Sequence, residues 1–147
     1  MRYEFDRLGW FHFEWLVQTC LKAEFGFTVE SWGGHRDLGR DAYSSSTIEG
    51  LLTTTTLHGP VVFQAKFVAE ANARGSDYKN PLFSACRAEA LAIKKRVQQQ
   101  LWREPRTYVL ITNCPVTQGD RDGVAEILNG ETSARVLVFG EMTFQQF

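Results

Sequence analysis

The chain has 147 residues, which suits one domain with a substantial core. Its formal net charge is −1, and this argues against tight autonomous DNA binding while leaving room for a local basic patch. Its cysteines, Cys20, Cys86 and Cys114, are too widely spaced for a disulfide framework or a zinc site, and Cys20 and Cys86 are expected to be core thiols. With no apolar run of membrane-spanning length and no signal-peptide pattern at the N-terminus, we expect a cytoplasmic protein with no membrane partner.

The first half of the chain predicts one helix followed by strands. Apolar residues recur at helical spacing between residues 6 and about 24. Three β-prone segments are then expected to be strands: 27–32, 40–46 and 61–67. The glycine-rich stretch 33–39 predicts a tight loop, and 47–60 a long, partly extended connection.

The second half predicts helices that alternate with strands. Pro81 is expected to open a helix that ends near 103. Its apolar stripe would contain Leu82, Cys86, Ala90, Ile93, Val97 and Leu101. A strand, a short helix and a last strand follow at 107–113, 119–130 and 134–140. The order α-β-β-β-α-β-α-β predicts a three-strand meander extended by parallel strands, and therefore an α/β fold with a central mixed sheet flanked by helices.

Two polar residues interrupt the apolar strand predicted at 61–67. Side chains alternate across a strand, so Gln64 and Lys66 share the face opposite to Phe63 and Ala65. Lysine is rarely buried without a partner. One interpretation is an edge strand with both side chains in water, and the other is a functional site.

Two carboxylates extend the second interpretation. Glu14 is expected on the apolar stripe of the first helix, where a carboxylate is costly unless it is paired or binds a metal. The alternative is that Glu14 lies at the edge of that stripe. Asp41 begins the second predicted strand and could instead be a turn residue, as could Asp37. A meander would bring Asp41 beside Gln64 and Lys66, and such carboxylate and amide oxygens suit Mg²⁺.

Four motifs carry a resemblance to a known family. They are "FEWLV" (13–17), "GFTVE" (26–30), "GGHRDLGRDA" (33–42) and "VVFQAKF" (61–67). In this order they resemble the Mrr-type restriction endonuclease domain of the PD-(D/E)xK nuclease superfamily. The later "YVLITN" and "ARVLVFG" are similar to the strands that follow in that family.

The resemblance implies a restriction-endonuclease-like fold over residues 1–147 and a Mg²⁺-dependent DNA endonuclease, for which Mn²⁺ could substitute. It implies that Asp41, Gln64 and Glu14 are metal ligands and that Lys66 is catalytic, with Gln64 standing where related nucleases carry an acid. The expected partners are DNA, a fused or associated NTPase or sensor region, and further copies of the chain in the active state. The alternatives are a catalytically inactive nuclease-fold module that binds DNA or a partner, and a purely structural α/β domain.

A basic segment could contact DNA phosphates. Residues 87–106 contain Arg87, Lys94, Lys95, Arg96, Arg103 and Arg106 against Glu89 and Glu104. Such a segment is equally typical of a solvated helix face, so both interpretations stay open.

Overall fold

The computed structural model describes residues 9–25, 30–31, 41–50, 55–73, 75 and 77–141, without the side chains of residues 10, 11, 30, 31 and 41. The predicted glycine-rich loop, with Asp37, lies outside the described residues. Most of the strand predicted at 27–32 does so too.

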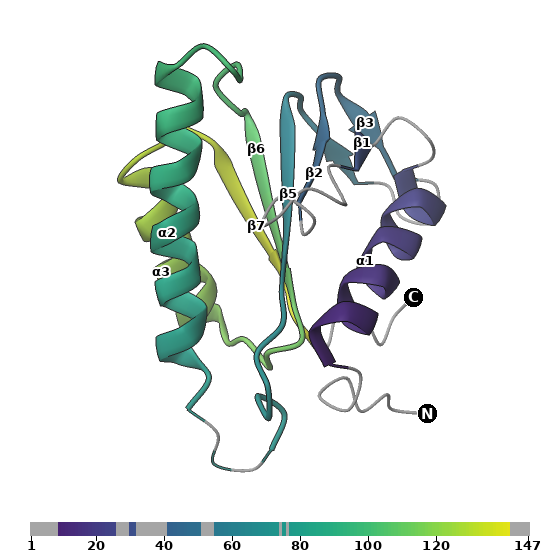
Figure 1. Ribbon diagram of the computed structural model, residues 1–147, viewed down its shortest axis with the longest axis vertical. Coiled ribbons are helices and arrows are strands. Elements are labelled where there is room, and N and C mark those ends of the chain that lie inside the picture. Colours follow the sequence, from purple (N-terminus) through teal and green to yellow (C-terminus); the bar gives the residue numbers. More distant parts are fainter. Residues whose placement is uncertain are drawn as a thin grey trace.

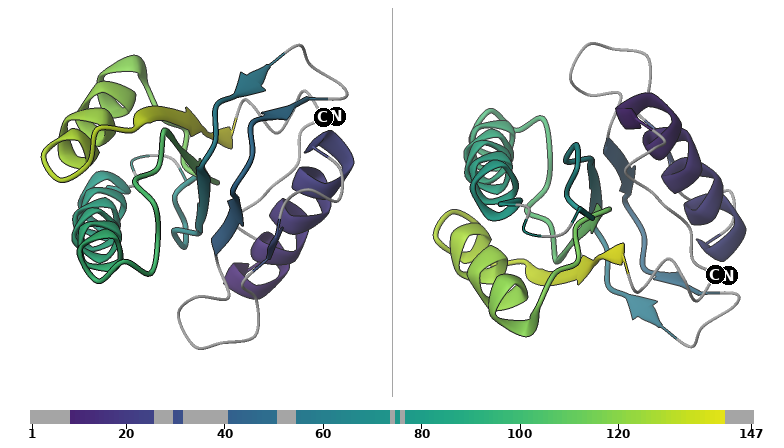
Figure 2. Two further views of the ribbon diagram at one scale, coloured as in Figure 1. Left: turned by 90° about the horizontal axis from the view of Figure 1, so that it is seen from above. Right: turned by 90° about the horizontal axis from the view of Figure 1, so that it is seen from below.

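Helices cover both faces of a central sheet (Figure 1). The helices are α1 (Gly9–Phe25), α2 (Lys79–Gln98) and α3 (Gln118–Asn129). The strands are β1 (Glu30–Ser31), β2 (Asp41–Ser44), β3 (Ile48–Glu49), β4 (Thr56–Leu57), β5 (Val61–Lys66), β6 (Thr107–Thr112) and β7 (Arg135–Phe139). Figure 2 shows α1 on one side of the sheet and α2 with α3 on the other.

The main sheet of the described residues has the order β1-β2-β5-β6-β7. β1, β2 and β5 pair antiparallel, which is the predicted meander. β5, β6 and β7 pair parallel, each joined to the next through a helix. The mixed α/β architecture is therefore confirmed. The connection at 47–60 contains β3 and β4, which pair antiparallel as a separate small sheet.

Each face of the sheet packs its own hydrophobic cluster, because the side chains of β5 and β6 alternate between the faces. On the α1 face, Phe13 and Val17 pack with Phe63. On the α2 and α3 face, Leu82 and Leu128 belong to a cluster with strand residues such as Val62, Tyr108 and Leu110. All six residues of β6 are buried, as expected for a parallel strand covered on both sides.

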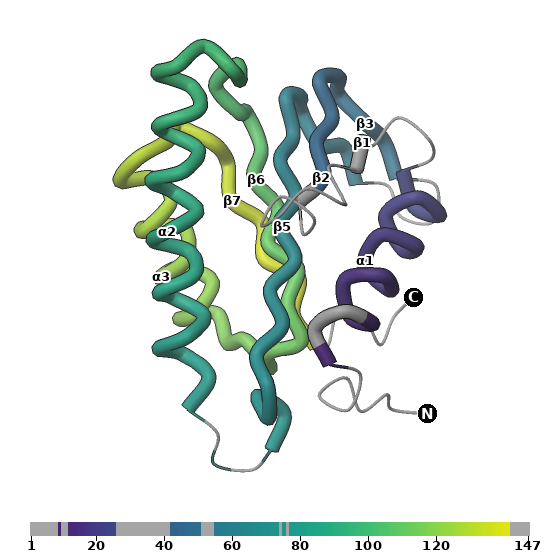
Figure 3. Tube along the Cα trace, viewed as in Figure 1, coloured from purple at the N-terminus to yellow at the C-terminus, as the bar shows by residue number. Residues whose placement is uncertain are grey.

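The boundaries predicted for α2 are corrected by the structure. The helix begins at Lys79, two residues before Pro81, and ends at Gln98 rather than near 103. Gln100 takes a left-handed backbone conformation (φ 60°), and the N–H of Leu101 bonds back to the carbonyl of Arg96 at 2.9 Å. Figure 3 shows the chain turning there toward β6. Leu101 is 69% exposed, so its assignment to the apolar stripe was wrong.

The cysteine predictions hold for Cys86, which is buried in the core, whereas Cys20 is only partly buried at the edge of the α1 cluster. None of the helices among the described residues is long and apolar enough to cross a membrane.

Candidate functional site

The register between β2 and β5 brings two predicted site positions together. The Cα of Asp41 pairs with that of Gln64, although 22 residues separate them in the sequence. Lys66 follows two positions later on β5 and pairs with Thr112 of β6. β5 therefore lies between β2 and β6, and the interpretation of Gln64 and Lys66 as residues of an exposed edge strand is wrong.

Gln64 is held by two neighbours on the α2 face of the sheet. The hydroxyl of Tyr108 on β6 donates a hydrogen bond to Oε1 of Gln64. Nε2 of Gln64 donates to Oε2 of Glu89 on α2, at 3.3 Å. These bonds explain how an amide can stand in a largely buried strand, because a buried polar group is costly unless it is hydrogen-bonded.

Glu89 is the functional candidate that the sequence interpretation missed. It is 8% exposed, and its Oε1 lies 3.9 Å from a guanidinium nitrogen of Arg96. Burial raises the pKa of Glu89, and the positive charge of Arg96 opposes that rise. The spacing could have identified it: Glu89 follows Cys86 by three residues and precedes Ile93 by four, so it interrupts an apolar stripe as Glu14 does.

Arg96 is itself fixed by aromatic contacts. Its guanidinium lies 4.6 Å from the ring centre of Trp102. Trp102 stacks on Tyr43 of β2, with ring centres 5.9 Å apart. The turn after α2 thus packs Trp102 between β2 and the helix and holds the partner of Glu89 in place.

Lys66 is half-buried on the same face of β5 as Gln64. Burial raises the pKa of the Cys86 thiol to about 12 and that of Cys114 to about 11, and the positive charge of Lys66 partly offsets both shifts. Lys66 is the last residue of β5 and pairs with the last residue of β6, so it lies at the carboxyl ends of these two strands.

Glu14 lies on a different side of the sheet. Its helix, α1, packs on the opposite face of β5 through Phe13 and Val17, and the rings of Phe13 and Phe67 are 5.7 Å apart. Glu14 is half-buried and interacts with a neighbour. The described elements therefore do not bring Glu14 beside Gln64, and its role as a ligand stays a prediction.

Asn113 extends the β5–β6 ladder with its side chain. Its Oδ1 accepts from the N–H of Val68 and its Nδ2 donates to the C=O of Val68, both at 2.8 Å. Asn72 binds the Asn113 carbonyl at 2.7 Å. The sequence indicated no role for Asn113, and the structure shows that it fixes the segment that directly follows Lys66.

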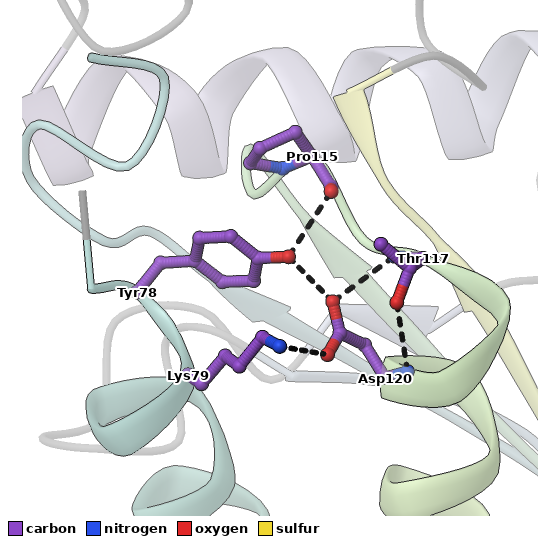
Figure 4. Close-up of polar contacts among 5 residues, drawn as sticks. All are labelled: Tyr78, Lys79, Pro115, Thr117 and Asp120. Carbon is purple, nitrogen blue, oxygen red and sulfur yellow. Dashed lines mark hydrogen bonds and ion pairs between the residues drawn. The ribbon is translucent and has the colours of Figure 1, made fainter. Parts of the chain in front are cut away.

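A second polar cluster joins the N-termini of α2 and α3 (Figure 4). The Tyr78 hydroxyl contacts Oδ2 of Asp120 and the carbonyl of Pro115, and Lys79 lies 3.6 Å from Oδ1 of Asp120. Thr117 and Asp120 form a capping box on α3.

The contacts of this cluster shift the pKa values of its members. Burial and the nearby Asp120 carboxylate raise the pKa of Tyr78. Burial alone would raise the pKa of Asp120, but hydrogen bonds from Thr117 and Tyr78 and the charge of Lys79 lower it. Because both carboxylate oxygens of Asp120 have partners, this cluster is a structural clamp.

The basic segment 87–106 is partly engaged within the fold. Lys94 pairs with Glu131 at 2.9 Å, and Arg103 donates to the carbonyl of Ser45 at 3.0 Å. With Arg96 paired to Glu89, three of its six cations have partners in the chain. Arg87, Lys95 and Arg106 are exposed, so fewer cations are available to contact phosphate than the sequence indicated.

The oxygen donors at the β2–β5 pair are of the type that Mg²⁺ prefers. Among the described side chains, no group of three or more His, Cys, Asp or Glu residues is arranged to hold a metal, and the side chain of Asp41 lies outside that set. No protein-family model, curated protein or solved structure matches the chain. The fold and the site thus define an α/β domain with a polar site on its central strand.

Proposed function

We propose that this chain is a Mg²⁺-dependent DNA endonuclease domain with a restriction-endonuclease-like fold, acting in the cytoplasm in restriction or antiphage defence. The observation that carries the proposal is the β2–β5 register, in which Asp41 pairs with Gln64 and Lys66 follows on the same strand. Residues from two separate motifs meet at neighbouring backbone positions. This proximity supports the nuclease over a purely structural α/β domain.

The proposed roles follow from the chemistry of each group. The carboxylate of Asp41 and the carbonyl oxygen of Gln64 would hold Mg²⁺. The metal would supply an activated water and charge stabilisation at phosphorus. Lys66 would stabilise negative charge that develops on the phosphate. Because Gln64 is neutral, we expect weak metal binding until a DNA phosphate adds its charge.

The test is cleavage of supercoiled plasmid DNA in Mg²⁺ and in EDTA. Asp41→Ala and Lys66→Ala should each lower the cleavage rate about 10²-fold or more, since each removes a charged group from the reacting centre. Lys22→Ala is the matched control, because Lys22 is exposed on α1, outside the basic segment 87–106 and on the face of the sheet opposite to Gln64 and Lys66. Rapid cleavage by a folded Asp41→Ala chain would refute the assignment.

The second candidate is a nuclease-fold module that binds DNA or a partner without cutting. The observation in its favour is that both ends of the Gln64 amide are already hydrogen-bonded within the chain. Retention of labelled DNA by the wild-type chain, with no cleavage in Mg²⁺ or Mn²⁺, would favour this candidate over the endonuclease.

A further inference from the structure

The two partners of Gln64 determine which end of its amide points where. Oε2 of Glu89 accepts a hydrogen bond from the NH₂ group of Gln64 at 3.3 Å, so that end of the amide faces Glu89. The Tyr108 hydroxyl donates to the carbonyl oxygen on the other side. An amide oxygen has two lone pairs, and Tyr108 occupies one of them. No other group among the described residues donates to Oε1, so within that part of the chain its second lone pair is available for another interaction.

Glu89 occupies its position against a large desolvation penalty. Its side chain is 9% exposed, and its Oε1 has no hydrogen bond among the described residues. Arg96 is close enough for an ion pair, at 3.9 Å, but not for a hydrogen bond. A hydrophobic residue would fill such a position on the apolar stripe of α2 more cheaply. The presence of a carboxylate here therefore indicates that Glu89 has a function, and its hydrogen bond to the Gln64 amide indicates which one.

We propose that Glu89 and Tyr108 are positioning residues that lock the Gln64 amide, so that its carbonyl oxygen rather than its NH₂ group is presented to the cation held with Asp41. This inference rests on the proposed nuclease function. Without the lock, rotation of the amide by half a turn would present a hydrogen-bond donor to the metal. Groups that orient a metal ligand typically change metal affinity or activity about 10- to 100-fold when they are removed.

The orientation of Gln64 can be measured without any activity. In an isotope-labelled chain, Gln64→Met identifies the side-chain NH₂ signals of Gln64 by their disappearance. Glu89→Gln should shift or split these signals, because two facing amides can pair in either orientation. Tyr108→Phe should shift them too, and it provides a second variant if Glu89→Gln folds poorly. Glu126→Gln, an exposed change on α3, is the matched control and should leave them unchanged.

The consequence for the metal is measured separately. The Mg²⁺ concentration for half-maximal cleavage should rise about 10-fold in Glu89→Gln and in Tyr108→Phe, with a smaller change in the rate at saturating Mg²⁺. A merely structural role for Glu89 would lower the unfolding midpoint and leave the Mg²⁺ requirement unchanged.

The outcomes separate the two proposals. Suppose that the wild-type protein cleaves DNA and that Glu89→Gln folds. Unchanged Gln64 signals or an unchanged Mg²⁺ requirement in that variant would then refute the positioning role and leave the nuclease proposal intact. Wild-type protein that never cleaves DNA would refute the nuclease proposal, and with it the task assigned to the Gln64 oxygen.

Discussion

Asn113 is fully buried. Its side-chain amide makes the pair of hydrogen bonds that the backbone of a neighbouring strand residue would otherwise make. It pairs with both the N–H and the C=O of Val68, two residues after Lys66. A backbone group buried without a partner is costly, so this pairing stabilises the chain where β5 has ended. Asn113 thus fixes the path of the segment that directly follows the proposed catalytic lysine.

Asn113→Asp should destabilise the protein by about 2 kcal/mol or more at neutral pH, because the new carboxylate oxygen would face the Val68 carbonyl. Burial should raise the pKa of the new carboxyl above its unfolded value of about 4. The variant would therefore lose stability relative to wild type as pH rises from about 4, and would recover it as pH falls, because the protonated acid can donate to Val68. Urea unfolding at several pH values measures this, with exposed Asn129→Asp as the control. A deficit independent of pH would contradict it.

The polar residues of β5 could be identified from the sequence, but their partners could not. Alternation in "VVFQAKF" correctly set Gln64 and Lys66 on one face. The partners of Gln64 lie 25 and 44 residues away, so only the tertiary packing of α2 and β6 could reveal them. Glu89 carried a local signal in its stripe position, whereas Tyr108 in an apolar strand carried none.

At the level of whole elements, the N-termini of α2 and α3 are joined through Asp120. Its carboxylate accepts from the Thr117 N–H at 3.0 Å, contacts the Tyr78 hydroxyl and pairs with Lys79. The first turn of a helix also favours a negative charge. The clamp therefore combines a helix cap with a tie between the two helices on one face of the sheet.

Asp120→Asn should destabilise the fold by about 1–3 kcal/mol at neutral pH, because it removes the charge from these hydrogen bonds. The folded state lowers the pKa of Asp120, so its contribution is present above the ordinary value of 3.8 and is lost as pH falls below it. The deficit of Asp120→Asn should therefore shrink in acid. Asp122→Asn makes the same chemical change at an exposed position of α3 and should cost about 0.5 kcal/mol or less. Equal effects of both changes in urea unfolding would refute the clamp.

Element types were more predictable than element ends. Helical spacing continues from Val97 to Leu101, so nothing in the local pattern indicates that α2 stops at Gln98. The stop is a tertiary effect, since Trp102 packs on Tyr43 and Arg96 after a residue, Gln100, with positive φ. Glycine usually marks such a position, and its absence hid the boundary.

Across the whole molecule, the alternation of helices and strands predicted the mixed sheet, but not which helix covers which face. Steps from β5 to β6 and from β6 to β7 run in one direction across the sheet, so right-handed crossovers put α2 and α3 on one face. α1 covers the other face. Local sequence patterns do not determine the order of strands in a sheet. For this reason the sequence could not reveal that the helix of Glu14 and the side chain of Gln64 lie on opposite faces of the sheet.

The charge of the whole chain bears on how the proposed nuclease would be activated. A net charge of −1 provides little long-range attraction for DNA. Three of the six cations between residues 87 and 106 already have partners within the chain. The remaining ones can neutralise only a few phosphates, and each such contact weakens with salt. A single copy should therefore bind DNA weakly and cut it slowly.

Assembly of several copies should raise the rate, because linked sites meet DNA at high effective concentration. We expect the chain fused to a dimerising tag to cleave plasmid DNA about 10-fold faster or more than the untagged chain, at equal site concentration and fixed salt. The control is the same tag with a substitution that blocks its dimerisation. The advantage should grow as salt is raised over a moderate range, since two linked weak sites retain DNA where one site releases it. Equal rates for the dimerised and monomeric forms would show that one copy suffices, and that clustering does not activate the proposed nuclease.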